Sequence, residues 1–135
     1  MGNAAICWES KKQSNVAIST SEAEYVAISE ACKEAKFLKN LLNELVNKDE
    51  SVSLYNDNQS AIAWANGHTA YNRTKHIDIK HHFVREAVES GVVKLRYLNS
   101  NDMIADILTK ALAKEKHLKF VAGLGLKIER LFCHD

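Results

Sequence analysis

The chain has 135 residues, 46% of them hydrophobic, which suits one soluble domain with a single core. Its 18 Lys and Arg residues against 17 Asp and Glu give a net charge of +1, which excludes a global attraction to nucleic acid and requires any polyanion site to be a local patch. No apolar run is long enough to cross a bilayer and no signal-peptide core is present, so we expect an intracellular protein without a membrane partner.

The N-terminal part of the sequence predicts a strand and a basic turn. Residues 4–8 are mostly apolar, as in a strand, and Lys11 and Lys12 follow in a polar turn. Three cysteines are present, odd in number and without the spacing of metal ligands: Cys7, Cys32 and Cys133. They are predicted to be reduced thiols, two of them buried.

Residues 19–46 predict a long helix. It can begin with a capping box, either from Ser19 to Glu22 or from Ser21 to Glu24. Glu24 belongs to an apolar row at steps of three and four: Ala27, Ala31, Ala35, Leu38, Leu42 and Leu45. A carboxylate on a core-facing row needs a partner, a proton or a cation. The alternative is that Glu24 completes the capping box and folds back on the backbone.

Asp57 stands where a strand gives way to a helix. Residues 51–56 alternate as in a strand, and residues 59–65 have helical spacing. Asp57 is therefore placed at the carboxyl end of a strand, where ligand sites gather in α/β sheets. The alternative is that Asp57 only caps the helix by accepting a backbone hydrogen bond.

The second half of the chain predicts one strand between helices. The expected elements are a helix over 75–90, a strand over 92–98, a helix over 104–111 and a helix over 113–122. Asp106 lies near the start of the third of these elements, beside the positive end of a helix.

A histidine-rich and basic segment surrounds the start of the helix over 75–90. Zinc is not favoured there, because structural zinc sites need four convergent ligands and only His82 has a carboxylate, Asp78, four residues earlier. Several cations in the same segment instead favour phosphate contact: Arg73, Lys75, Lys80 and Arg85.

Three acids share one kind of position. Glu24, Asp57 and Asp106 each lie at the beginning of a helix or at the end of a strand. In a sheet covered by helices these points can converge, and clustered carboxylates are tolerated mainly around a divalent cation. Hard oxygen ligands favour magnesium or manganese, and two ions held by carboxylates suit phosphodiester cleavage. We therefore predict a metal site formed by these three residues.

Five short motifs occur in one order along the chain: SKKQ at 10–13, STSEAEY at 19–25, DNQSA at 57–61, TKHIDI at 74–79 and ADILTK at 105–110. Together they resemble the ribonuclease H domain at the C-terminal end of copia-type LTR-retrotransposon Pol polyproteins. The resemblance covers residues from about 6 to 126, and it implies a partial domain over residues 1–126 with a tail over residues 127–135.

The resemblance implies an α/β ribonuclease H-like fold, with a mixed central sheet and flanking helices. It implies hydrolysis of the RNA strand of RNA–DNA hybrids with Mg²⁺, or Mn²⁺, held by Glu24, Asp57 and Asp106. The reverse transcriptase domain of the same polyprotein is a further expected partner, and the location is the cytoplasmic virus-like particle of an active element. Expected contacts with the hybrid are Lys11, Lys12, Asn58, Gln59, Arg73, Lys75, His76 and Lys80.

The sequence departs from the family at its beginning. The family has a further acid on its first strand, in a motif similar to Asp-Ala-Asp-Trp, and this motif is absent here. We therefore expect a domain without its first two strands, with one open edge beside the strand over 51–56 and weak activity at most. The alternatives are a non-catalytic nucleic-acid-binding or interaction module that keeps the fold, and a relic chain without a selected activity.

Overall fold

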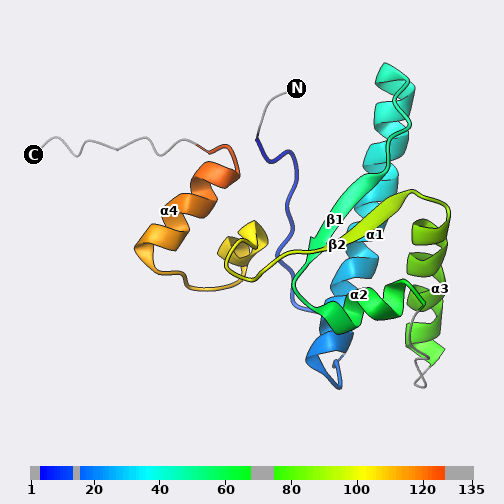
Figure 1. The fold of residues 1–135 in the computed structure, drawn as a ribbon, viewed down its shortest axis with the longest axis horizontal. Coiled ribbons are helices and arrows are strands. Elements are labelled where there is room, and N and C mark those ends of the chain that lie inside the picture. Colours follow the sequence, from blue (N-terminus) through cyan, green and yellow to red (C-terminus); the bar gives the residue numbers. More distant parts are fainter. Residues whose placement is uncertain (1–3, 14–15, 68–74, 127–135) are drawn as a thin grey trace, which may run out of the picture. The chain divides into compact units, whose positions relative to one another are not determined.

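The computed structural model of the chain describes residues 4–13, 16–67 and 75–126, with only the backbone for residues 75–78 (Figure 1). The chain divides into two compact units. The larger unit spans Asn15–Asn101, and the smaller unit combines Met1–Ser14 with Asp102–Asp135. None of the described helices combines the length and the apolar composition that crossing a bilayer requires.

The larger unit begins with the long helix α1, Thr20–Val46. Ser19 caps it, since its hydroxyl accepts a hydrogen bond from the Glu22 amide at 3.2 Å. The Glu22 carboxylate folds back and accepts from the Ile18 amide at 2.9 Å. Of the two capping registers that the sequence permits, the one from Ser19 to Glu22 is therefore formed, and Glu24 is left out of the cap.

The sheet of the larger unit consists of the parallel strands β1, Val52–Asn56, and β2, Val93–Tyr97. Val52 pairs with Val93 at one end of the ladder and Asn56 with Tyr97 at the other. Helices α2, Gln59–Ala65, and α3, Lys75–Glu89, connect the strands, and α1 packs against both helices and both strands (Figure 1). The predicted elements from 19 to 98 are thus present, within a residue or two at most ends.

Two predictions about the sheet are wrong for the described residues. Residues 4–8 form no strand, and the sheet is a parallel pair rather than a mixed one. The Ala5 amide instead donates a hydrogen bond to the Leu124 carbonyl at 2.9 Å, inside the smaller unit. An apolar pentapeptide acquires strand structure only if a neighbouring strand edge accepts it, and sequence alone does not reveal whether one does.

The core of the larger unit lies between the helices α1, α2 and α3 and the sheet. Its buried apolar residues are Tyr25, Ile28, Cys32, Ala35, Ala61, Ala65, Val84, Ala87 and Val93. Of the apolar row predicted to face the core, only Ala35 is buried, whereas Ala27, Leu42 and Leu45 are exposed. The sequence of α1 carries two apolar rows, and the row that contains Tyr25, rather than the row that contains Glu24, packs inward.

The hydroxyl of Ser29 lies within this core. Ser29 is 0% exposed, and its Oγ has no hydrogen-bond partner among the described residues. Because a buried hydroxyl without a partner is destabilising, Ser29→Ala is expected to raise the free energy of unfolding by about 1 kcal/mol in a urea titration. Ser60→Ala, at an exposed position of α2, controls for helix propensity alone. Destabilisation by Ser29→Ala would mean that this hydroxyl is hydrogen-bonded in solution.

Burial also sets the chemistry of the Cys32 thiol. Cys32 is 0% exposed, and this burial raises the pKa of its thiol from 9.0 to about 11. Between these two pH values the folded chain retains a proton that the unfolded chain has lost. The free energy of unfolding should therefore fall as the pH rises from about 9 to about 11, by at most about 1.4 kcal/mol per pH unit for one proton.

The measurement is a series of urea titrations from pH 8 to pH 11 on the chain and on Cys32→Ala. The stability difference between the two proteins should shrink as the pH rises, because alanine has no proton to lose. Burial, and to a smaller extent the charge of Cys32, also raise the pKa of the Tyr25 hydroxyl, and the subtraction removes the part of that contribution that comes from burial. A difference that stays constant with pH would show that the thiol ionises equally in both states.

The smaller unit is built from the 3₁₀ helix η1, Ile104–Leu108, and the helix α4, Lys114–Gly123. The predicted helix over 104–111 is thus shorter and more tightly wound than expected. Phe120 of α4 is 1% exposed, and a Cβ at Gly123 would meet the Ile104 side chain at 2.8 Å. Glycine at 123 therefore lets α4 approach η1 closely.

Candidate active site

Glu24 is half-buried in the first turns of α1 and is bound to the end of β1. Its Oε2 accepts a hydrogen bond of 2.9 Å from Nδ2 of Asn56, the last residue of β1. Asn56 is itself only 8% exposed. The alternative in which Glu24 folds back on its own backbone is wrong, because Glu22 performs that role.

Asp57 follows β1 directly, and its side chain is hydrogen-bonded to a residue that follows β2. Its Oδ2 accepts a hydrogen bond of 2.9 Å from the hydroxyl of Ser100, three residues after β2. Since β1 and β2 are parallel, both carboxyl ends lie at one edge of the sheet, which brings these residues together. The helix cap is Asn58, whose Oδ1 accepts from the Ala61 amide at 3.0 Å. The interpretation of Asp57 as a mere cap is therefore wrong.

The two asparagines beside Asp57 fasten its loop to the start of α1. Asn56 Oδ1 accepts from the Asn58 amide at 2.8 Å, which closes a turn around Asp57. The side chain of Asn58 donates to Ser21 Oγ at 3.2 Å. Sequence reasoning missed Asn56, Ser21 and Ser100, although an acid flanked by two asparagines is a visible signal of a loop fixed by side-chain hydrogen bonds.

Asp106 belongs to the smaller unit, in η1. It is 8% exposed, and its Oδ1 lies 2.8 Å from the Nζ of Lys110. Glu24 and Asp57 belong to the larger unit. Across the residues that the structure describes, no group of three or more His, Cys, Asp or Glu side chains could hold a metal ion. The convergence of Glu24, Asp57 and Asp106 therefore stays a prediction.

The donor set of the larger unit suits a hard cation. Glu24 and Asp57 offer carboxylate oxygens, which are the ligands that magnesium and manganese prefer. Both acids are attached to one edge of the sheet, Glu24 through Asn56 and Asp57 as the next residue in the chain. These two residues fit the implied ion in chemistry, since magnesium is commonly bound through one or two carboxylates.

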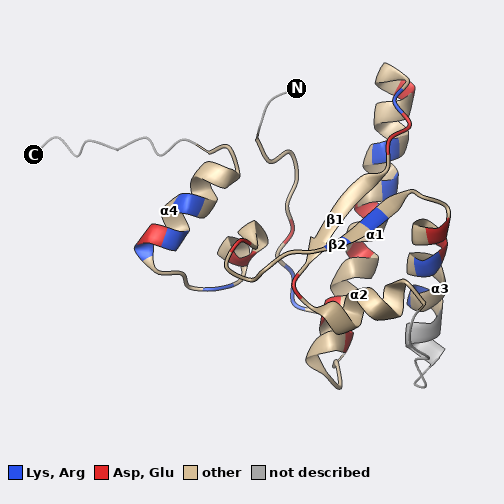
Figure 2. Ribbon diagram, in the orientation of Figure 1, with Lys and Arg blue, Asp and Glu red and all other residues tan. Residues whose placement is uncertain are grey.

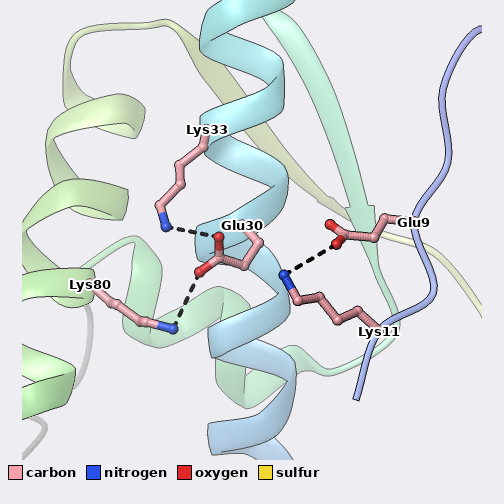
Figure 3. A network of polar contacts seen from close by, with 5 residues as sticks. All are labelled: Glu9, Lys11, Glu30, Lys33 and Lys80. Atoms are coloured by element: carbon pink, nitrogen blue, oxygen red, sulfur yellow. Dashed lines mark hydrogen bonds and ion pairs between the residues drawn. The ribbon is translucent and has the colours of Figure 1, made fainter. Parts of the chain in front are cut away.

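Figure 2 shows Lys and Arg residues on α1, α3 and α4, but of these three helices only α3 carries cations expected to contact nucleic acid. Lys80 of α3 lies 3.3 Å from Glu30 of α1, and Lys33 lies 2.8 Å from the same carboxylate (Figure 3). The hydrogen bond from Lys33, with a smaller contribution from Lys80, holds the pKa of the Glu30 carboxyl below its ordinary value. A phosphate group would therefore have to displace the Glu30 carboxylate in order to pair with Lys80.

The other expected contacts differ in their surroundings. In the smaller unit, Lys11 pairs with Glu9 at 3.6 Å (Figure 3). Lys12 is exposed. Gln59 is exposed at the start of α2. Arg73 lies outside the described residues, as do the side chains of Lys75 and His76.

The chain is similar to parts of much longer curated proteins. It is 42% identical over 112 residues to the Retrovirus-related Pol polyprotein from transposon TNT 1-94 of Nicotiana tabacum, a match that covers 83% of this chain and 8% of that protein. It is 33% identical over 127 residues to the corresponding polyprotein from transposon RE1 of Arabidopsis thaliana, covering 93% of this chain and 9% of that protein. The polyprotein from transposon RE2 of Arabidopsis thaliana is 32% identical over the same length.

No family model matches the chain, and no solved structure matches it. The chain spans less than a tenth of the length of the relatives described above. Over most of its own length, the chain is homologous to a segment of copia-type retrotransposon Pol polyproteins.

Proposed function

We propose that the chain is a ribonuclease H-like segment of a retrotransposon Pol polyprotein that hydrolyses the RNA strand of RNA–DNA hybrids. The observation that carries this proposal is the hydrogen bond between Glu24 and Asn56, which joins an acid of α1 to the strand end that bears Asp57. Two acids attached to one edge of a parallel sheet, in a chain homologous to Pol polyproteins, suit metal-dependent cleavage of a phosphodiester.

The residues of the chain have distinct parts in this proposal. Glu24, Asp57 and Asp106 would hold magnesium, for which manganese can substitute, through hard carboxylate oxygens. When bound, the ions would supply electrostatic stabilisation of the attacking and leaving oxygens. The proposed contacts with the hybrid backbone are Lys11, Lys12, Asn58, Gln59, Arg73, Lys75, His76 and Lys80. Phosphate contacts of this kind position a duplex without reading its sequence.

The same homology supports two proposals about the surroundings of the reaction. We propose the reverse transcriptase domain of a Pol polyprotein as a further partner, and a cytoplasmic virus-like particle as the location. Neither proposal requires a membrane contact.

A non-catalytic hybrid-binding module is the second candidate. One observation favours it: across the residues that the structure describes, no group of three or more His, Cys, Asp or Glu side chains could hold a metal ion. Such a module would bind hybrids through its basic residues, and its affinity would fall as the salt concentration rises.

The test is incubation of the chain with a hybrid labelled on its RNA strand, in magnesium and separately in manganese. Slow cleavage of the hybrid, but not of a DNA duplex of the same sequence, is expected over hours. A filter-binding titration on the same hybrid separates the two candidates. Salt-dependent binding without cleavage in either metal would favour the non-catalytic module, and the absence of both would contradict the proposed function.

A further inference from the structure

We propose that Asn56 is a positioning residue that fixes the Glu24 carboxylate beside Asp57, so that the two acids can hold one divalent cation. This inference rests on the proposed function, and it assigns a role to a residue that the three-acid pattern does not include. Asn56 joins Glu24 to the turn around Asp57, since its Nδ2 donates to Glu24 Oε2 at 2.9 Å and its Oδ1 accepts from the Asn58 amide at 2.8 Å.

The chemistry of the two partners fixes the orientation of the carboxamide. An ionised carboxylate can only accept hydrogen bonds, and a backbone amide can only donate one. Nδ2 must therefore face Glu24 and Oδ1 must face Asn58. In the flipped orientation, Oδ1 would face the Glu24 carboxylate as a second acceptor, and Nδ2 would face the Asn58 amide as a second donor. Asn56 is 8% exposed, so water has little access to replace either bond.

Asparagine suits this position better than its nearest substitutes. Aspartate has the same size but offers two acceptors, so its carboxylate would repel that of Glu24. Leucine offers neither a donor nor an acceptor. Serine is too short to reach Glu24, but its hydroxyl can still accept a hydrogen bond from the Asn58 amide and so close the turn. A carboxylate has about four lone-pair sites, so a hydrogen bond from Asn56 leaves Glu24 with capacity for a cation.

The second fastening of the loop provides a matched control. Asn58 also joins the Asp57 loop to α1, but through Ser21 rather than through an acid. Ser21→Ala removes this bond and leaves the helix cap by Asn58 in place. If looseness of the loop were all that mattered, Asn56→Ser and Ser21→Ala would have similar effects.

The experiment measures Mn²⁺ affinity of the full chain from the electron paramagnetic resonance of free Mn²⁺. Outer-shell partners of metal ligands commonly change metal affinity by tenfold or more. Asn56→Ser is therefore expected to weaken Mn²⁺ binding about tenfold, and Ser21→Ala less than about twofold. In parallel, addition of Mg²⁺ should shift the side-chain amide resonances of Asn56 in the chain and leave them in place in Glu24→Gln.

Each of these measurements either supports or contradicts the positioning role of Asn56. Equal Mn²⁺ affinity in the chain and in Asn56→Ser would overturn the proposal, as would an equal loss in Ser21→Ala. Absence of Mn²⁺ binding by the chain, or Asn56 resonances that ignore Mg²⁺, would overturn it as well. A chain that binds Mn²⁺ through Asn56 and Glu24 but neither cleaves nor binds hybrids would sustain the positioning role and contradict only the proposed function.

Discussion

Asp57→Asn is expected to slow hydrolysis of an RNA–DNA hybrid by at least about a hundredfold, because it removes one of the charges that would hold the metal. Loss of a single electrostatic stabiliser of a transition state commonly has an effect of this size. The substitution is nearly isosteric, and the amide oxygen can still accept the hydrogen bond from Ser100. The free energy of unfolding should therefore stay within about 1 kcal/mol of that of the parent chain.

Asp49→Asn is the matched control for this substitution. Asp49 also carries a carboxylate in the larger unit, but it is exposed and pairs with Lys39 at 2.9 Å. The Asp49 side chain is 74% exposed although that of Lys39 is only 14% exposed, and the amide oxygen of asparagine can still accept a hydrogen bond from Lys39, so both the rate and the stability should remain close to those of the parent chain. Initial rates of hybrid cleavage and urea titrations on the three proteins provide the comparison. Cleavage by Asp57→Asn at the parental rate would remove Asp57 from the proposed site.

Tyr25→Ala should lower the free energy of unfolding by about 3–5 kcal/mol, as the loss of a large buried aromatic side chain commonly does. Tyr25 is 1% exposed at the centre of the core. Its ring stacks on that of His81, with centroids 5.1 Å apart and an interplanar angle of 18°, and lies 6.3 Å from the ring of Trp64. Alanine would remove both ring contacts and leave a cavity between α1, α2 and α3.

Tyr25→Phe separates the contribution of the ring to stability from that of the hydroxyl. The hydroxyl donates to the His81 carbonyl at 3.5 Å, which is long for a hydrogen bond of this type, so its removal is expected to cost less than about 1 kcal/mol. Thermal and urea unfolding, followed by far-ultraviolet circular dichroism, measure both variants. A loss in Tyr25→Phe as large as in Tyr25→Ala would mean that the hydroxyl, rather than the ring, stabilises the core.

The secondary structure of the larger unit was accessible from the sequence because its signals are local. Ser19 and Glu22 mark the start of α1, and the alternating pattern before Asp57 marks β1. The buried face of α1 was not accessible, since Tyr25 and Leu45 belong to two apolar rows of similar strength. Which row packs inward depends on where the sheet lies, and helical periodicity carries no information about that.

The candidate site was predictable only in part, for a similar reason. The position of Asp57 at a strand end follows from the local pattern, and so does the need for a helix cap nearby. Whether Asp57 or Asn58 provides that cap, and whether Glu22 or Glu24 folds back on α1, depends on competing side chains one or two residues apart. The bond from Asn56 to Glu24 joins separate elements, so no local pattern could reveal it.

The parallel pairing of β1 with β2 also has a kinetic consequence. Val52 and Val93 can meet only after the long intervening segment that contains α2 and α3 has closed, and the entropy of that closure is lost before the ladder forms. Parallel pairings between distant residues are intrinsically slow to form, whereas helices form from local contacts. Asp57 and Ser100 should therefore meet late on the folding pathway, after α1 has presented Glu24.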